Sequence, residues 1–455
     1  MPGADGVVTE VLPTVVRALQ REQGARPLSG PASRLRRSCQ EVLARCPNDC
    51  QDAPVEIGDV REAQQRIKGV IRDLPVQGAR WLSDQVGGPV YLIPENLQRA
   101  GSFKIRGAYN RIAQLTDDER SKGVVAASAG NHAQGVALAG QLLGVKVTVF
   151  MPVDASIPKI EATRGYGAEV RFHGTTVDEA LVEARAFADQ TGAILIHPFD
   201  HEHVVVGQGT LGLEIIEKIP DVKTVVVCTG GGGLLAGVAY AIKQLKPAVK
   251  VIGVQAEGAA TYPQSIAEGQ PVTRSQMNTM ADGIAIARPG DIPFQLIQQH
   301  VDEFRTVTED ELSRAVLMLL ERAKLVVEPS GAAATAAVMS APHDFEPPVA
   351  ITISGGNVDS LVLLRIIRHG MAAAGRYLSI SVHTPDFPGS LAGLLDVLKQ
   401  HKANVVDVFH DRTDPRVSIG DVRIDIQMET RSAEQRDQIV AALLAAGYQV
   451  EVLDG

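Results

Sequence analysis

A lysine between two apolar residues is the first group in this sequence that could do chemistry. Lys104 stands between Phe103 and Ile105 in the segment SFKIRGA, residues 102–108. Apolar surroundings disfavour the charged ammonium and lower its pKa, which leaves an amine that can attack an aldehyde. Most lysines are solvated surface charges, so Lys104 becomes informative only together with other groups.

Four consecutive glycines predict a phosphate-binding turn. The apolar segment 225–228 runs into glycines at positions 230–233, and a helical pattern begins at Leu234. Successive N–H groups without side chains at a helix N-terminus can surround a phosphate, whereas a tight turn needs only one or two glycines. No Lys-Ser/Thr pair follows, and the spacing differs from the dinucleotide fingerprint. The phosphate therefore belongs to another kind of ligand.

The lysine and the glycines fit one cofactor. Pyridoxal 5′-phosphate (PLP) carries both a phosphate and an aldehyde that reacts with a lysine amine. The two motifs together therefore predict a PLP site, although neither would do so alone.

Two polar segments that follow predicted strands could complete this site. Residues 128–135, SAGNHAQG, offer N–H groups for a substrate carboxylate, and Asn131 could donate to the cofactor's ring oxygen. An asparagine helix cap is the plainer alternative, and His132 fits a structural role as well as a catalytic one. Ser354, in the segment 352–357, would face the ring nitrogen. A serine leaves that nitrogen largely neutral, which favours elimination over transamination.

The elements that must position these groups alternate between strand and helix. Short β-branched runs are separated by amphipathic helical patterns such as 131–144 and 176–192, which predicts a parallel, doubly wound α/β architecture. The predicted strands are 123–128, 145–152, 168–174, 193–199, 224–230, 249–257 and 349–356.

The two ends of the chain differ from this pattern. Residues 1–55 predict an N-terminal extension that is partly helical, and residues 56–370 predict the catalytic domain. A weakly periodic stretch at 370–375 predicts a linker. Residues 376–455 then read as strand, helix, strand, strand, helix and strand, which is a ferredoxin-like βαββαβ unit.

Composition narrows the class of protein. The chain has 455 residues, 45% of them hydrophobic and 21% charged, with a net charge of −9. These values predict a folded enzyme-sized protein without nucleic acid as a partner. The uncharged stretch 225–242 is interrupted by the glycines, so we expect no membrane association. No secretory signal is visible and only four cysteines occur, so we expect a cytoplasmic protein.

Five motifs, in this order, resemble the threonine dehydratase (threonine ammonia-lyase) branch of the type II PLP fold. They are ENLQRAGSFKIRGAYN, SAGNHAQG, GGGGLLAG, VEPSGA and TISGGNVD, at residues 95–110, 128–135, 230–237, 327–332 and 352–359. The resemblance covers about residues 56–370 and implies two subdomains, each built on a parallel sheet. It also implies elimination of water and ammonia from a β-hydroxy amino acid, with threonine as substrate and serine as a second one.

The resemblance implies roles for individual residues. Lys104 would bond to the cofactor and later move the Cα proton, with Ser128 as a second catalytic residue near the substrate carboxylate. The implied cofactor-binding residues are Phe103, Lys104, Asn131, Gly230, Gly231, Gly232, Gly233, Leu234 and Ser354. The implied substrate-binding residues are Ser128, Ala129, Gly130, Asn131 and His132.

The C-terminal unit resembles an ACT domain, a regulatory module that binds amino acids where subunits pair. The resemblance implies an amino-acid effector, an allosteric homodimer or homotetramer, and an effector site formed by Asp386, Phe387, Pro388, Gly389 and Asn404. The alternative is a domain that only assembles the oligomer. Glu257 follows a strand where members of the family can hold a monovalent or divalent cation, or it is a solvated charge.

Other functions remain open at this point. A racemase is one alternative, but serine racemases of this family carry a second serine where this chain has Ala129, which provides no hydroxyl as a proton donor. Ammonia-lyases acting on serine or hydroxyaspartate, a β-replacement synthase of the same fold, and a non-catalytic regulatory subunit are the others. A non-catalytic protein would be expected to have lost Lys104 first.

Overall fold

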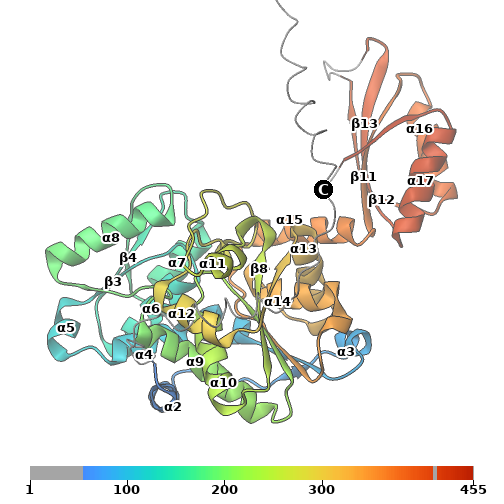
Figure 1. Cartoon of the computed structure of the whole chain (residues 1–455). Coiled ribbons are helices and arrows are strands. Elements are labelled where there is room, and N and C mark those ends of the chain that lie inside the picture. The colour runs from blue at the N-terminus through green and yellow to red at the C-terminus, as the bar shows by residue number, and fades with distance from the viewer. Residues whose placement is uncertain (1–54, 413–417, 454–455) are drawn as a thin grey trace, which may run out of the picture. The chain divides into compact units, whose positions relative to one another are not determined.

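The computed structural model of this protein describes residues 55–412 and 418–453. The predicted N-terminal extension, apart from Val55, and three of the four cysteines lie outside these residues. Residues 77–352 contain two separate sheets, and helices cover both (Figure 1).

The larger sheet has six strands in the order β1-β2-β10-β7-β8-β9, parallel throughout except for the antiparallel edge strand β1. Its strands are β1 (Gln77–Gly78), β2 (Val90–Ile93), β7 (Thr224–Cys228), β8 (Lys250–Ala256), β9 (Glu303–Val307) and β10 (Val349–Thr352). Strand β7, sequence TVVVC, is buried along its whole length. Continuous apolar strands of this kind are typical of parallel sheets covered on both faces.

The smaller sheet has four parallel strands in the order β5-β4-β3-β6. They are β3 (Val124–Ala127), β4 (Val147–Met151), β5 (Glu169–Phe172) and β6 (Ile194–Leu195). Along β3, Val124 and Ala126 join one hydrophobic core, whereas Val125 and Ala127 join another. Side chains alternate between the two faces of a strand, so this sheet is also covered on both faces. The predicted doubly wound fold class is thus confirmed.

The helices that cover the two sheets begin at recognisable capping sequences. Thr116, Thr176 and Thr308 each cap a helix and pair with a glutamate three residues later in a capping box. The helices are α2 (Ile57–Arg66), α3 (Arg80–Val86), α4 (Lys104–Ala113), α5 (Asp117–Lys122), α6 (Asn131–Leu143), α7 (Ile157–Gly165), α8 (Val177–Thr191), α9 (Glu202–Lys218), α10 (Gly233–Leu245), α11 (Tyr262–Glu268), α12 (Asp291–His300), α13 (Glu309–Met318), α14 (Pro329–Ser340) and α15 (Ser360–Ala373). Short turns include η1 (Glu95–Leu97), η3 (Glu257–Ala259) and η4 (Asp282–Ile284).

The C-terminal unit is an antiparallel sheet of four strands with two helices. It contains β11 (Tyr377–Pro385), α16 (Ser390–Gln400), β12 (Asn404–Asp411), β13 (Asp421–Glu429), α17 (Ala433–Ala445) and β14 (Gln449–Val452). The strand order β12-β13-β11-β14 is that of a ferredoxin-like fold, as predicted. Every second residue of β13 is buried, and these residues share one core with α16 and α17. This sheet is consistent with an ACT-like unit.

The predicted linker at 370–375 is mostly helical. Residues 370–373 form the last turn of α15, and Gly370 packs closely against Ser313, where a Cβ would lie 2.6 Å from the backbone oxygen. Only residues 374–376 connect α15 to β11. Weak periodicity in HGMAAAG was therefore misleading, because this turn is held by packing of a small residue and not by an apolar stripe.

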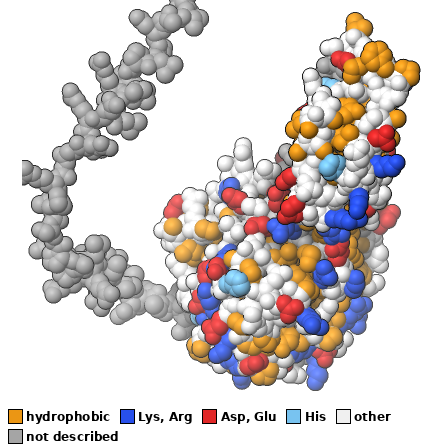
Figure 2. Space-filling view, turned by 90° about the vertical axis from the view of Figure 1, so that its right-hand side faces the viewer, with side chains coloured by type: hydrophobic (Ala, Val, Ile, Leu, Met, Phe, Trp, Pro, Cys, Tyr) orange, Lys and Arg blue, Asp and Glu red, His pale blue; other side chains and the backbone are white. Residues whose placement is uncertain are grey.

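On the face that Figure 2 shows, the Lys and Arg side chains of the described residues are interspersed with Asp and Glu. Among the residues that the structure describes, no helix is long and apolar enough to cross a membrane.

Candidate active site

One cavity of about 520 Å³ lies at the carboxyl ends of strands from both sheets. Ser128 directly follows β3, Gly230 comes two residues after β7, and Ser354 comes two residues after β10. Ligands of doubly wound proteins bind at this edge of a sheet. The residues predicted to bind cofactor and substrate all line this cavity: Phe103, Lys104, Ser128, Ala129, Gly130, Asn131, His132, Gly230, Gly231, Gly232, Gly233, Leu234 and Ser354.

Lys104 is the first residue of α4 and reaches into the cavity. Its Nζ donates a hydrogen bond to the carbonyl oxygen of Pro198 at 3.0 Å and lies 5.1 Å from the centre of the Phe103 ring. Burial lowers the pKa of Lys104 to about 8, although Cys228 and Glu328 act in the opposite direction. An appreciable fraction of this amine is therefore uncharged near neutral pH, as a nucleophile or a proton acceptor requires.

The glycine loop lies between β7 and the N-terminus of α10. Gly232 has φ of +99°, which favours glycine, and a Cβ on Gly231 would lie 2.5 Å from the ring of Phe199. The hydroxyl of Tyr262 and the backbone N–H of Gly290 both donate to the Gly231 carbonyl, at 3.2 and 3.0 Å. Because the first N–H groups of a helix have no intrahelical acceptor, this loop fits a phosphate.

Asn131, at the start of α6, is hydrogen-bonded to two residues from a distant part of the sequence, Glu328 and Asn357. Its Nδ2 donates to Glu328 Oε1 at 2.6 Å, and its Oδ1 accepts from Asn357 Nδ2 at 2.7 Å. A Cβ on Gly355 would lie 2.1 Å from the Glu328 carboxylate, so glycine leaves the room that this contact needs. Burial raises the pKa of Glu328 to about 7, and Asp282 adds to the shift. This side chain can thus gain or lose a proton near neutral pH.

Glu328 lies in the motif VEPSGA, but its role was not predicted from the sequence. The sequence does show a glutamate directly before Pro329, where a helix rich in small residues begins. This is the N-cap position of α14, and carboxylates are favourable at helix N-termini. That signal predicts a solvated cap as readily as a buried acid. Only the fold shows that Glu328 is buried in the cavity.

Ser354 contacts a thiol that sequence reasoning did not single out. The Sγ of Cys228 and the Oγ of Ser354 are 3.1 Å apart, and both side chains are buried. Burial raises the pKa of Cys228 to about 11, so the thiol stays protonated at neutral pH. Ser354 therefore has an uncharged neighbour in the Cys228 thiol. An uncharged environment is what a serine that faces a neutral ring nitrogen requires.

His132 lies in the cavity wall but has a structural bond. Its Nε2 is 2.7 Å from the carbonyl oxygen of Ile196, and since a carbonyl only accepts, the imidazole donates. Burial lowers the pKa of His132 to about 3, which keeps the ring neutral. The structural alternative therefore accounts for this residue without a catalytic role.

A buried ion pair fixes the helix that carries Lys104. The guanidinium of Arg106 binds both oxygens of Glu95 at 2.8 Å and both oxygens of Glu214 at 2.6 and 3.0 Å. Arg106 is completely buried, which alone would lower its pKa, but the two carboxylates outweigh this effect and raise the pKa. Arg106 lies two residues after Lys104, so these contacts hold the start of α4 in place.

The predicted effector residues fall into two groups that a single chain does not bring together. Pro385, which precedes Asp386, pairs with Asp421 at one end of β13, whereas Asn404 pairs with Glu429 at the other end. The eight steps along β13 from Asp421 to Glu429 span roughly 27 Å at a rise of about 3.4 Å per residue. The first group comprises Asp386, Phe387, Pro388 and Gly389, at the turn between β11 and α16.

The predicted cation ligand Glu257 lies in η3 with an exposed side chain. Within residues 55–412 and 418–453, no three His, Cys, Asp or Glu side chains are grouped so as to hold a metal ion. The neighbouring Gln255 uses its amide within the turn, accepting from the Tyr262 N–H at 2.8 Å and donating to Thr261 Oγ1 at 3.3 Å.

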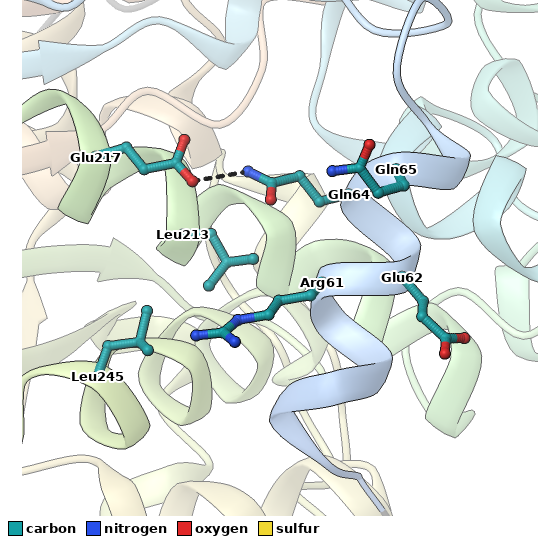
Figure 3. Close-up of a pocket in the computed structure, with 7 residues that line it drawn as sticks. All are labelled: Arg61, Glu62, Gln64, Gln65, Leu213, Glu217 and Leu245. Atoms are coloured by element: carbon teal, nitrogen blue, oxygen red, sulfur yellow. Dashed lines mark hydrogen bonds between the residues drawn. The ribbon is translucent and has the colours of Figure 1, made fainter.

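A second, more open pocket of about 350 Å³ lies between α2, α9 and α10 (Figure 3). Gln64 donates to Glu217 at 3.1 Å on one side of it. Its lining residues are Arg61, Glu62, Gln64, Gln65, Leu213, Glu217 and Leu245, none of which was predicted to do chemistry. The cavity around Lys104 remains the candidate active site.

The fold and this cavity define a PLP-dependent enzyme, and comparison with known proteins agrees. The family model described as pyridoxal-phosphate dependent enzyme matches residues 67–355. L-Threonine ammonia-lyase of Thermotoga maritima is 46% identical over 399 residues, which cover 88% of this chain and 100% of that protein. The homologous enzyme of Geobacter sulfurreducens is 41% identical over 87% of this chain and 98% of its own length. The chain belongs to the threonine ammonia-lyase branch of the PLP-dependent enzymes.

Solved structures show the same fold in the catalytic part. The processed form of threonine deaminase isoform 2 from Solanum lycopersicum is 37% identical with a TM-score of 0.66, covering 70% of this chain and 90% of that one. Maize serine racemase is 35% identical with a TM-score of 0.66, covering 69% and 96%. The predicted enzyme class and cofactor are thereby confirmed.

Proposed function

We propose that this protein converts L-threonine to 2-oxobutanoate and ammonia, and that it also acts on L-serine. The observation that carries the proposal is that Lys104, the glycine loop and Ser354 line one cavity. Relatives named L-threonine ammonia-lyase that align with 87–88% of the chain support the choice of substrate.

The residues present fit PLP. The loop at 230–233 lines the cavity without side chains that would cover its N–H groups, and the buried amine of Lys104 suits an aldehyde. When bound, PLP supplies that aldehyde and a conjugated ring that withdraws electrons from the substrate Cα. Asn131 would donate to the ring oxygen, and Ser354 would face the ring nitrogen.

Lys104 is the group that we assign to the Cα proton. Its lowered pKa leaves an uncharged Nζ that can accept this proton, and the loop at residues 128–130 would hold the substrate carboxylate. The substrate then loses its β-hydroxyl as water. Addition of water to the released enamine and loss of ammonia give the 2-oxo acid, so no oxidant or reductant is needed.

Ala129 supports elimination over racemisation. Racemisation needs a proton donor on the face opposite Lys104, and the side chain at position 129 is a methyl group. The structural likeness to serine racemases therefore reflects the shared fold and cofactor site.

We infer that the catalytic domain comprises about residues 56–370 and that residues 376–455 form a regulatory domain. The two groups of predicted effector residues lie at opposite ends of one sheet, so an amino acid that contacts both groups needs two chains. This geometry favours a homodimer or homotetramer that binds its effector between subunits. Deleting residues from 376 onward should remove any response to isoleucine or valine while the cofactor stays bound. A cation at Glu257 stays a prediction, and activity after dialysis against a chelator would test the divalent case.

The test of the main proposal is to add L-threonine and L-serine separately to the purified protein with PLP. We would follow 2-oxo acid, ammonia and the cofactor's absorbance together. Release of 2-oxobutanoate is expected. An absorbance change without release would reject threonine turnover and point to another amino acid.

A further inference from the structure

One side chain in the active-site cavity lacks a partner. Ser330 is only 2% exposed, and its Oγ has no hydrogen-bond partner among the described residues. Of the side chains of the described residues that line the cavity, Ser330 alone has a buried nitrogen or oxygen atom in this condition. Buried polar atoms are nearly always satisfied, so an orphan in a cavity indicates a group that a ligand satisfies.

The fold keeps this hydroxyl within reach of the cavity. Ser330 lies in the first turn of α14, two residues after Glu328, and Gly283 of η4 lies opposite. A Cβ at position 283 would lie 2.9 Å from Ser330 Oγ and would press against it. Glycine at this position therefore lets the backbone of η4 pass close to the hydroxyl without a clash.

The polar side chains that the proposed function assigns to the cofactor already have partners. Lys104 bonds to the Pro198 carbonyl, Asn131 to Glu328 and Asn357, and Ser354 contacts Cys228. In the proposed function, these groups and the glycine loop also account for the phosphate, ring oxygen and ring nitrogen of PLP. Residues 128–130 account for the substrate carboxylate. The β-hydroxyl of the amino acid is the polar group that still lacks a protein contact.

We propose that Ser330 binds the β-hydroxyl of the substrate and makes the site select hydroxyl-bearing amino acids. This inference rests on the proposed function, because it assumes an amino acid bound at Lys104. Ser330 can donate to the hydroxyl or accept from it, since a serine hydroxyl does both. A substrate without the hydroxyl leaves Ser330 unpartnered, and that difference is the source of selectivity.

The inference can be tested without turnover. In the holoenzyme, the cofactor's absorbance gives apparent Kd values for L-threonine and for L-2-aminobutanoate, which differs from threonine in lacking the hydroxyl. Where threonine is consumed, its rapid initial absorbance change is measured by stopped flow. We expect Ser330→Ala to reduce the preference for threonine about tenfold, the ratio that one ordinary hydrogen bond provides. Affinity of the apoprotein for PLP should change by less than about twofold.

Thr335 offers a matched control on the same helix. Its hydroxyl is also buried without a partner among the described residues, but Thr335 does not line the cavity. Thr335→Val should leave the preference for threonine unchanged. Neither variant removes a hydrogen bond seen in the structure, so both are expected to fold.

Turnover gives a second measurement. Ser330→Ala should lower kcat/KM for L-threonine and L-serine about tenfold, but lower it less than twofold for β-chloro-L-alanine, whose leaving group donates no hydrogen bond. An equal loss for all three, an unchanged Kd ratio, or a weakened affinity for PLP would overturn the inference. If the wild-type protein releases no 2-oxo acid from threonine, the proposed function fails, whereas the Kd ratio still decides the role of Ser330.

Discussion

The ion pair behind Lys104 allows a stability prediction with a worked magnitude. Glu95→Gln removes one of the two carboxylates that bind Arg106, and both side chains are almost fully buried. Breaking a buried pair costs about 3–5 kcal/mol because a charge is left without compensation. Glu214 still binds Arg106, so we expect the lower end, about 3 kcal/mol.

This cost converts into a shift of the melting temperature. Unfolding entropy is about 2.1 cal/mol/K per residue, or about 0.6 kcal/mol/K for roughly 300 residues of the catalytic part. A loss of about 3 kcal/mol then lowers Tm by about 5 °C. The assay is thermal unfolding of the holoenzyme, followed by far-ultraviolet circular dichroism at fixed PLP concentration, since bound ligand raises the apparent stability.

An exposed ion pair provides the control. Asp118 and Lys122 pair on α5 with side chains 75% and 43% exposed, and such pairs contribute little to stability. Asp118→Asn should therefore shift Tm by less than about 1 °C. If the Tm of Glu95→Gln also lies within 1 °C of the wild-type value, the buried Arg106–Glu95 pair contributes no more to stability than an exposed pair. That result would refute the reasoning.

Three further predictions concern the cavity. Lys104→Ala should abolish both the absorbance of lysine-bound cofactor and turnover, and retained turnover would reject the catalytic assignment. Glu328→Gln should flatten the pH dependence of stability: burial raises the Glu328 pKa to about 7, so its favourable contribution is complete below about pH 4.5 and disappears as pH rises through 7. The wild type should thus lose about 3 kcal/mol relative to the variant over that range, and parallel Tm curves would contradict this. Tyr262→Phe removes one of two donors to the Gly231 carbonyl and should weaken PLP binding of the apoprotein about two- to tenfold, as measured by fluorescence titration.

Sequence reasoning could place most of the cofactor site because its residues follow strands. Ser128, Gly230 and Ser354 each stand at the carboxyl end of an apolar run, and parallel strands bring such ends to one edge. The four glycines and the lysine predicted PLP because few other residue types can surround a phosphate with N–H groups or react with an aldehyde.

The missed residues depend on contacts between distant segments. Glu328 and Ser330 occur in the motif VEPSGA. The sequence around them does not show that the Glu328 carboxylate is buried beside Asn131 or that the Ser330 hydroxyl lacks a partner among the described residues. Nothing in the sequence near Arg106 indicates that its charge is buried. The two carboxylates that make this burial possible, Glu95 and Glu214, lie 11 and 108 positions away. The distance between Asn404 and Asp386 likewise required the register of β13.

The short connection between α15 and β11 limits how subunits can exchange parts. Four steps of the backbone separate Ala373 from Tyr377, a reach of at most about 14 Å. A C-terminal unit on so short a tether cannot dock on a distant catalytic domain of another chain, so domain swapping would require partial unwinding of α15. Inserting a flexible segment between residues 374 and 376 would lengthen this tether and make exchange between chains possible.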